Sequence, residues 1–301
     1  MISIVPIEYN SFFRLASRAF SEARFPLYFS NFSKKTYGNF VHVFLHVYKE
    51  RTNASYDRLR ELVIENKLTR MLGIKSIPHK SNMSRFLKKI DKEVLREMIR
   101  ACARIVNIIE SKSIIDSTGF SLTNPSHYYL KRINGKSPKN FVKTSLLVDS
   151  RLKIVLNAQT HSKNVHDIND FIPLINEMRG VVKNILADKA YDSTNVLEYC
   201  KLNGINPMIP VREWKNFRDG YGAKPRIGGK LRRKMFENFD AKEYARRNIV
   251  ESINSAIKRT LGGFVRSRLA GSQEKTALFK ALTYTLEIIN RKITLTIHLR
   301  S

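Results

Sequence analysis

Four residues with chemically useful side chains recur at helical spacing within residues 241–260. They are Tyr244, Arg247, Glu251 and Lys258, at offsets of 0, 3, 7 and 14. At about 100° per residue, these offsets place all four within roughly 60° of one another on one helix face. The apolar residues of the segment fall on the opposite face: Ala245, Ile249, Val250, Ile253, Ala256, Ile257 and Leu261. The pattern predicts a continuous helix that packs by its back and presents a carboxylate among cations. Such a face suits a polyanion and a metal ion, although ordinary amphipathic helices also carry mixed charges.

Two further acids follow short apolar runs. Asp116 comes directly after Ile114 and Ile115, and Asp188 ends the run that begins at Ile185. We expect both at the carboxyl ends of interior strands, where α/β sheets place their sites. With Glu251 they would supply three carboxylates from separate elements. Three such groups can hold two divalent cations, which activate a water and stabilise the leaving oxygen of a phosphodiester. Mg²⁺ suits this role because it takes few carboxylates and keeps its waters, and Mn²⁺ could substitute.

Other candidate ligands have simpler interpretations. We expect Asp149 in a hairpin turn, Asp167 or Asp170 at a helix N-cap, and Asp192 as the cap of a helix beginning near Thr194. The histidines show no metal-ligand spacing, and His161 and His166 fit a loop before a helix. Cys102 and Cys200 fit buried thiols of a reducing compartment.

The periodicity of the chain changes near residue 110. Residues 1–109 show helical spacing in 40–50, 55–73 and 92–110. Strand-length apolar runs follow at 113–120, 141–149, 152–160, 181–191 and 205–211, with helical patterns at 167–180 and 193–204. This order predicts an α/β fold, a mixed sheet with helices on its faces, as a domain over 110–301.

Two basic segments could contact nucleic acid. The short helix expected after Ser81 or Asn82 carries Arg85, Lys88 and Lys89 beside Ser84, and could read base edges. Residues 212–240 mix glycines with Lys and Arg, and predict an irregular basic insertion that is either a solvated loop or a phosphate contact. Candidate contacts there are Trp214, Arg232, Arg233 and Lys234.

The charge of the chain points to an anionic partner. Its 301 residues carry a formal net charge of +28 and a pI near 10.2, with 43% hydrophobic residues. Nucleic acid or an anionic membrane surface would be the natural partner. We favour nucleic acid and no membrane role, because we find neither a basic-aromatic lipid-binding helix nor an apolar span of about 18 residues. The N-terminus lacks the pattern of a signal peptide, so we expect a cytoplasmic, nucleoid-associated protein.

Three segments resemble a known family. IIDSTGF, ILADKAYDS and YARRNIVESINSAIK are similar to the three acidic motifs of DDE transposases from bacterial and archaeal insertion sequences. The last matches the Y-x2-R-x3-E-x6-K signature of one large branch without a gap. The resemblance covers roughly residues 110–270. It implies an RNase H-like core with Asp116 on the first strand, Asp188 on the fourth and Glu251 on the helix after the fifth.

The resemblance also implies roles for the neighbouring side chains. Arg247 and Lys258 would contact transposon-end phosphates, with Tyr244 helping to position them, and we expect both cations to be exposed beside Glu251. In relatives with a large β insertion, a Trp in this stretch can hold a flipped base. The stretch is short here, so packing is the favoured role for Trp214 and DNA contact the alternative.

These expectations converge on a DNA transposase. It would bind the terminal inverted repeats of its element as a homo-oligomer, hydrolyse phosphodiesters and join the freed 3′ hydroxyls to target DNA. Two alternatives stay open at this point. One is a nuclease or resolvase with the same core, and the other is a non-catalytic DNA-binding protein derived from a transposase.

Overall fold

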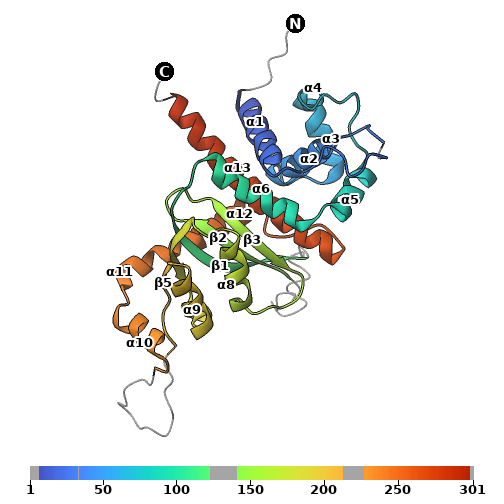
Figure 1. Ribbon diagram of the computed structural model, residues 1–301. Helices are drawn as coiled ribbons and strands as arrows, with labels where there is room; N and C mark the ends of the chain where they lie inside the picture. The colour runs from blue at the N-terminus through green and yellow to red at the C-terminus, as the bar shows by residue number, and fades with distance from the viewer. Residues whose placement is uncertain (1–6, 33, 123–140, 213–226, 299–301) are drawn as a thin grey trace, which may run out of the picture.

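A five-stranded sheet forms the centre of the computed structural model, which describes residues 7–32, 34–122, 141–212 and 227–298 (Figure 1). The strands are β1 (Ser111–Ser121), β2 (Phe141–Asp149), β3 (Val155–His161), β4 (Val182–Ala187) and β5 (Asn206–Met208). Their order is β3-β2-β1-β4-β5, with β1, β2 and β3 antiparallel neighbours. β4 is parallel to β1, and β5 is parallel to β4. The predicted α/β fold, a mixed sheet with helices on its faces, is confirmed.

The parallel strands are reached through helical crossovers, as parallel pairing requires. Helix α8 (Ile168–Asn176) connects β3 to β4, and α9 (Thr194–Leu202) connects β4 to β5. Both lie within the segments where helical periodicity was expected. Strands β2 and β3 are joined by a hairpin, in which the Asp149 carboxylate accepts hydrogen bonds from the backbone N–H of Arg151 and Leu152 at 3.1 and 2.6 Å. Asp149 therefore has the turn role that we predicted.

Helices cover both faces of the sheet. Adjacent residues of a strand point to opposite faces, and Asp116 of β1 accepts a hydrogen bond from Asn254 of α12 (Asn248–Leu261). The next residue, Ser117, lies 2.8 Å from Ser145 Oγ, which donates to Asp170 of α8. Helix α12 and helix α8 therefore lie on opposite faces. Because helices cover both faces of the sheet, every residue of β2 after the first is buried.

We expected Asp167 or Asp170 to cap α8, but both carboxylates bind other side chains. Asp167 stands at the N-cap position without a side-chain cap bond, and its carboxylate instead pairs with Lys143 at 2.8 Å. Asp170 is buried and pairs with Lys143 and with His161, whose Nε2 lies 2.6 Å away. These contacts bind α8 to β2 and β3.

The N-terminal part is helical, as predicted. Its helices are α1 (Ile7–Glu22), α2 (Asn39–Arg51), α3 (Tyr56–Glu65), α4 (Leu68–Met71), α5 (Lys80–Lys89) and α6 (Lys92–Ile105). The run expected over 55–73 is two helices, because the backbone turns at Lys67, whose φ is 53°. Ser55 accepts a hydrogen bond from the N–H of Arg58 and so caps α3, which confirms the predicted start.

The last helix joins the two parts of the chain. Helix α13 (Ala270–His298) packs against α2, α6 and β3, and crosses behind the N-terminal helices in Figure 1. Lys280 of α13 and Glu50 of α2 form a buried ion pair of 2.9 Å, which Lys49 extends. Buried side chains from α1 to α13 form one cluster. The domain boundary at residue 110 stays a prediction, and core packing continues across it.

Two simpler expectations concern the described residues. None of the helices there has the length and apolar character needed to cross a membrane. Cys102 and Cys200 are both buried free thiols, and burial raises the pKa of each to about 12. The predicted burial of both thiols is confirmed, and a thiol buried in this way is unreactive.

Candidate active site

The sheet brings two of the three predicted acids together. Parallel pairing between β1 and β4 ends with Ile115 opposite Ala187, and the next residue on each segment is an acid, Asp116 or Asp188. Asp188 follows the end of β4, as predicted, and its Oδ1 accepts a hydrogen bond from the N–H of Lys189. Asp116 is not at a strand end, because β1 continues to pair with β2 as far as Ser121. The acid is therefore inside a strand but just beyond the β4 partner.

The helix that carries the third acid is broken near its start. The continuous helix expected over 241–260 consists of α11 (Ala241–Tyr244), a 3₁₀ turn η3 (Ala245–Arg247) and α12. Asp240 caps α11 by accepting hydrogen bonds from two backbone N–H groups. Within α12, the predicted apolar back is buried at Val250, Ile253, Ile257 and Leu261. The helix thus presents Glu251 on the face that looks toward β1.

Arg247 lies among all three acids. Its Nη2 is 3.3 Å from Asp116 Oδ1 and 3.5 Å from Asp188 Oδ2, and its Nη1 is 2.8 Å from Glu251 Oε1. Only 17% of the Arg247 side chain is exposed. The expectation of an exposed arginine beside Glu251 was therefore wrong in one respect, because ion pairs with the acids draw the guanidinium inward. The three acids that we selected from sequence do converge on a single group.

Asn254 is a site residue that sequence analysis missed. Its Nδ2 donates to Asp116 Oδ2 at 3.1 Å, and the residue is 8% exposed. Its Oδ1 is buried and has no hydrogen-bond partner. The available signal was its position, three residues after Glu251, which places both on the same helix face. Asn254 holds Asp116 and leaves one acceptor beside it.

An open cleft of about 500 Å³ lies between β1 and α12. Its lining includes Asp116 and Glu251 together with Asn254, Lys258 and Arg259. Lys258 is half-buried in the cleft wall, and burial lowers its pKa. The two cations stand about two turns after Glu251, so an anionic chain that crossed the cleft would meet them next to the acids.

Burial and charge act in opposite directions on the pKa of Asp116 and on that of Tyr244. Burial raises the pKa of Asp116, and the nearby Arg247 guanidinium only partly offsets this effect. Tyr244 packs against Phe239 with ring centroids 5.2 Å apart, and burial raises the pKa of its phenol as well. Tyr244 therefore stands as a neutral ring next to the acids and Arg247.

The acids suit a divalent cation by their chemistry. Oxygen ligands of this kind are those that Mg²⁺ and Mn²⁺ prefer, and the unpartnered Asn254 Oδ1 offers one more. Oxygens of Asp116 and Asp188 already converge on one positive nitrogen, Nη2 of Arg247. As the side chains stand, no group of three or more His, Cys, Asp or Glu among the described residues is arranged to hold a metal ion. Arg247 would have to leave the acids when a cation binds.

The predicted contacts in the basic insertion have mixed outcomes. Trp214 lies outside the described residues. Arg232 forms a bidentate ion pair with Asp192, with distances of 2.9 and 2.6 Å. That carboxylate also accepts a hydrogen bond from the backbone N–H of Arg212. The prediction that Asp192 caps α9 was therefore wrong. Ser193 occupies the cap position instead.

The end of the insertion is helical and not irregular. Residues 230–237 form α10 (Lys230–Glu237), which has no buried residue and is held by Arg232. Arg233 and Lys234 are exposed on this helix. Both are therefore free to approach a phosphate, whereas Arg232 has a structural partner.

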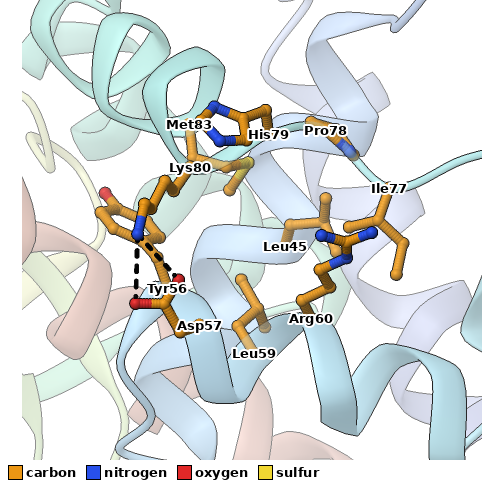
Figure 2. Close-up of a pocket in the computed structure, with 10 residues that line it drawn as sticks. All are labelled: Leu45, Tyr56, Asp57, Leu59, Arg60, Ile77, Pro78, His79, Lys80 and Met83. Carbon is orange, nitrogen blue, oxygen red and sulfur yellow. Dashed lines mark hydrogen bonds and ion pairs between the residues drawn. The ribbon is translucent and has the colours of Figure 1, made fainter.

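Helix α5 presents the polar residues that we predicted for base contacts. Arg85, Lys88 and Lys89 are exposed, while Met83 and Phe86 face the core. The helix begins two or three residues earlier than expected, because the ring of His79 accepts a hydrogen bond from the N–H of Ser81 and takes the cap position. A pocket of about 320 Å³ separates its start from α3, and an ion pair between Lys80 and Asp57 lies at one side (Figure 2).

Fold and acids together define the class of this chain. A mixed sheet that carries acids on adjacent strands, with a third on a helix of one face, characterises RNase H-like proteins. The family model described as the transposase DDE domain matches residues 109–286. This is more than half of the chain, which therefore belongs to the DDE transposase family. Members of this family generally use divalent metal ions.

A solved structure gives a more distant likeness. It is described as a cryo-EM structure of piggyBac transposase in a synaptic complex with hairpin DNA. The match has a TM-score of 0.45 and 12% sequence identity, and covers 95% of this chain and 74% of that chain. A likeness of this degree supports no conclusion about the activity of the present protein.

Proposed function

We propose that this protein is the transposase of an insertion sequence, of the branch with the Y-x2-R-x3-E-x6-K signature. It would bind terminal inverted repeats as a homo-oligomer, hydrolyse phosphodiesters and transfer the 3′ hydroxyls to target DNA. The observation that supports this best is the convergence of Asp116, Asp188 and Glu251 on the Arg247 guanidinium. Three acids from separate elements, held around one positive group, form a site for cations next to an anionic substrate.

Each residue of the site has a definite task in this proposal. Asp116, Asp188 and Glu251 would hold two Mg²⁺ ions, with Mn²⁺ as a substitute. Bound divalent ions would supply an activated water and stabilise the leaving oxygen. Asn254 would keep the Asp116 carboxylate oriented through its 3.1 Å hydrogen bond. No covalent bond to the protein is needed, because a water and then a 3′ hydroxyl serve as nucleophiles.

The cations of the cleft would bind the DNA backbone. Lys258 and Arg259 line the cleft beside the acids, and each phosphate contact adds to a salt-dependent affinity. Arg247 would exchange its carboxylate partners for a phosphate when DNA and cations arrive. Tyr244 would fix the position of the strand through its ring.

Cleavage of labelled DNA tests the proposal. The full chain is incubated with Mg²⁺ and a duplex that carries the repeats flanking its gene, and the nicks are resolved by strand. Nicks at the repeat ends, followed by joining to a second duplex, are expected. Cutting of branched DNA without regard to the repeats would indicate a nuclease or resolvase instead. Binding to the repeats without cleavage would indicate a non-catalytic DNA-binding protein.

A further inference from the structure

A second pocket lies on the N-terminal helices, away from the acids. It is formed between the segment that precedes α2 and the exposed side of α5, and its volume is about 210 Å³. Four tyrosine and phenylalanine rings, the ring of His42 and three cations are among its lining: Tyr28, Phe29, Tyr37, Phe86, His42, Lys34, Arg85 and Lys89. This volume is below the roughly 300–1,000 Å³ of pockets that hold drug-sized ligands. The pocket therefore suits one small planar group.

Rings of the core support the wall of this pocket. His42 stacks on Phe86 with centroids 4.8 Å apart and an interplanar angle of 14°, and Phe29 lies 5.5 Å from the same ring. Tyr37 meets His42 edge-on at 5.9 Å. Burial lowers the pKa of His42 to about 4, so this ring is neutral near pH 7. The wall is thus aromatic, uncharged and fixed by packing.

The rim of the pocket carries positive charge without a balancing acid. Lys34, Arg85 and Lys89 are exposed, and none of them forms an ion pair with an acid in the part of the chain that the structure describes. None of the residues that line the pocket is acidic. The pocket between α3 and α5 differs, because Asp57 lies in it and pairs with Lys80 (Figure 2).

We infer that this pocket binds one unpaired nucleotide of DNA. Its base would stack on the aromatic wall at Tyr28 and Tyr37, and its phosphate would contact Lys34. Aromatic faces beside cations are the means by which proteins hold single-stranded nucleic acid. Asn82 also lines the pocket and offers an amide donor and acceptor to the base edge. The inference rests on the proposed function, since it assumes a DNA substrate, and it identifies which form of DNA is preferred.

Two duplexes of the same sequence test the inference with the full chain. One is blunt, and the other carries a short extension of unpaired thymidines. Binding of each is followed by fluorescence anisotropy at the same salt concentration. A stacked base contributes about 1–3 kcal/mol, so the extended duplex should bind roughly 5-fold to 150-fold more tightly.

Variants of aromatic residues in the segment before α2 show whether the pocket causes the preference. Tyr28→Ala should abolish it and leave the blunt-duplex affinity within about twofold, whereas Tyr28→Phe should retain it because the ring persists. Phe32→Ala is the matched control, since Phe32 is 98% exposed on the same segment and does not line the pocket. It should keep the preference. Lys34→Gln should weaken binding to the extension, because a cation that holds its phosphate is removed.

Several results would overturn the inference. Equal affinity of the wild type for both duplexes would remove the preference, and equal losses in Tyr28→Ala and Phe32→Ala would remove its assignment to the pocket. Tighter binding of an extension made of RNA would exclude DNA as the ligand. Binding to the blunt duplex without preference would leave the proposed function intact. Absence of binding to either duplex would contradict both proposals.

Discussion

At the scale of single residues, Arg247 explains how three carboxylates from separate elements lie together. Carboxylates at close range disfavour one another's ionised form, and the guanidinium contacts all three. A divalent cation would stabilise the three carboxylates in the same way, with twice the charge of the guanidinium. Arg247 and a metal ion should therefore compete for the acids.

Removal of Arg247 should strengthen metal binding in the absence of DNA. For Arg247→Gln we expect the affinity for Mn²⁺ to rise roughly tenfold, which corresponds to about 1.4 kcal/mol. Calorimetric titration of the DNA-free protein measures this affinity directly. Arg246→Gln is the matched control, because Arg246 is exposed and pairs with Glu243 at 3.3 Å. An unchanged or weaker Mn²⁺ affinity in Arg247→Gln would show that the two do not compete.

Each acid should be indispensable for cleavage. Asp116→Asn, Asp188→Asn and Glu251→Gln keep the shape of the side chain and remove the charge that holds a cation. Mg²⁺-dependent cleavage should fall more than about 100-fold in each, since even neighbours of metal ligands cost 10–100-fold. In a variant that combines two of these substitutions, the loss of cleavage should be smaller than the product of the two single losses. Circular dichroism and DNA binding should be retained, and Glu243→Gln should cleave normally. Near-normal cleavage by any of the three would exclude that residue.

Sequence analysis could predict these three acids because the signals for each are local. A short apolar run that ends in an acid and a helix face are both readable from a few neighbouring residues, although Asp116 lies inside its strand and not at its end. Asn254 was not found, since its role depends on contact with Asp116, which lies 138 residues earlier. The inward position of Arg247 was missed for the same reason, because long-range ion pairs decide it.

At the scale of elements, the order of strands and helices was predictable and their ends were not. The segment 141–149 coincides with β2, because its apolar run is bounded by a turn that Asp149 forms. The predicted helix over 241–260 breaks at Arg247, where helical periodicity continues but the backbone tightens to a 3₁₀ turn. The apolar pattern of α10 is weak, so the glycines before it suggested an irregular loop.

Helix α10 should depend largely on one ion pair for its attachment, because its only packing against the core of the described residues is by the partly buried Leu231 and Met235. None of its residues is buried, and Arg232 forms two hydrogen bonds with the buried carboxylate of Asp192. In Arg232→Ala we expect faster hydrogen exchange across 230–237 with little change in global stability. Arg233→Ala should leave exchange unchanged, since Arg233 is exposed and donates to a backbone carbonyl. Equal exchange in both variants would show that other contacts hold the helix.

The contact between α2 and α5 should weaken in acid. Burial lowers the pKa of His46 to about 3, against an ordinary value of 6.5, and its Nε2 donates to the carbonyl of Met83 at 3.2 Å. Below pH 6.5 His46 becomes protonated in the unfolded chain but stays neutral in the folded chain. The contribution of His46 to the free energy of unfolding is therefore complete above pH 6.5 and is lost as the pH falls toward 3.

Chemical denaturation at pH 7, 6 and 5 measures this loss. A histidine that titrates only in the unfolded state lowers the free energy of unfolding by up to about 1.4 kcal/mol per pH unit. His46→Gln keeps a donor for Met83 and should reduce the slope by about that amount. His79→Gln is the control, because His79 lies at the surface end of α5. An unaltered slope in His46→Gln would contradict the prediction.

At the scale of the whole molecule, the core shared by the N-terminal helices and the sheet limits how the roles of the two parts can be tested separately. Helix α13 packs against α2 and α6, and its Lys280 is buried against Glu50. A chain that lacked residues 1–109 would expose this apolar surface and leave Lys280 without its carboxylate. Loss of a buried partner is strongly destabilising. Surface variants, and not truncation, are therefore the means to separate sequence recognition from phosphate affinity.

Helix α5 should supply sequence preference, and α10 should supply phosphate affinity. The exposed face of α5 combines Arg85, Lys88 and Lys89 with polar neighbours that can reach base edges. Helix α10 offers Arg233 and Lys234 next to glycines, which suit the backbone. Replacement of the three α5 cations by Ala should lower the ratio of affinities for terminal-repeat and scrambled DNA. Each side chain that no longer reads a base should cost about 1–3 kcal/mol of discrimination.

The α10 pair behaves differently under the same competition assay. Arg233→Ala with Lys234→Ala should weaken binding to both DNAs by the same factor and lower the salt slope by about one for each phosphate that is no longer neutralised. The two sets of variants serve as controls for each other, because each removes surface cations without touching the core. If the α5 variant kept its discrimination while the α10 variant lost it, recognition would lie in the insertion. The N-terminal helices would then act in packing or in contacts between copies of the chain.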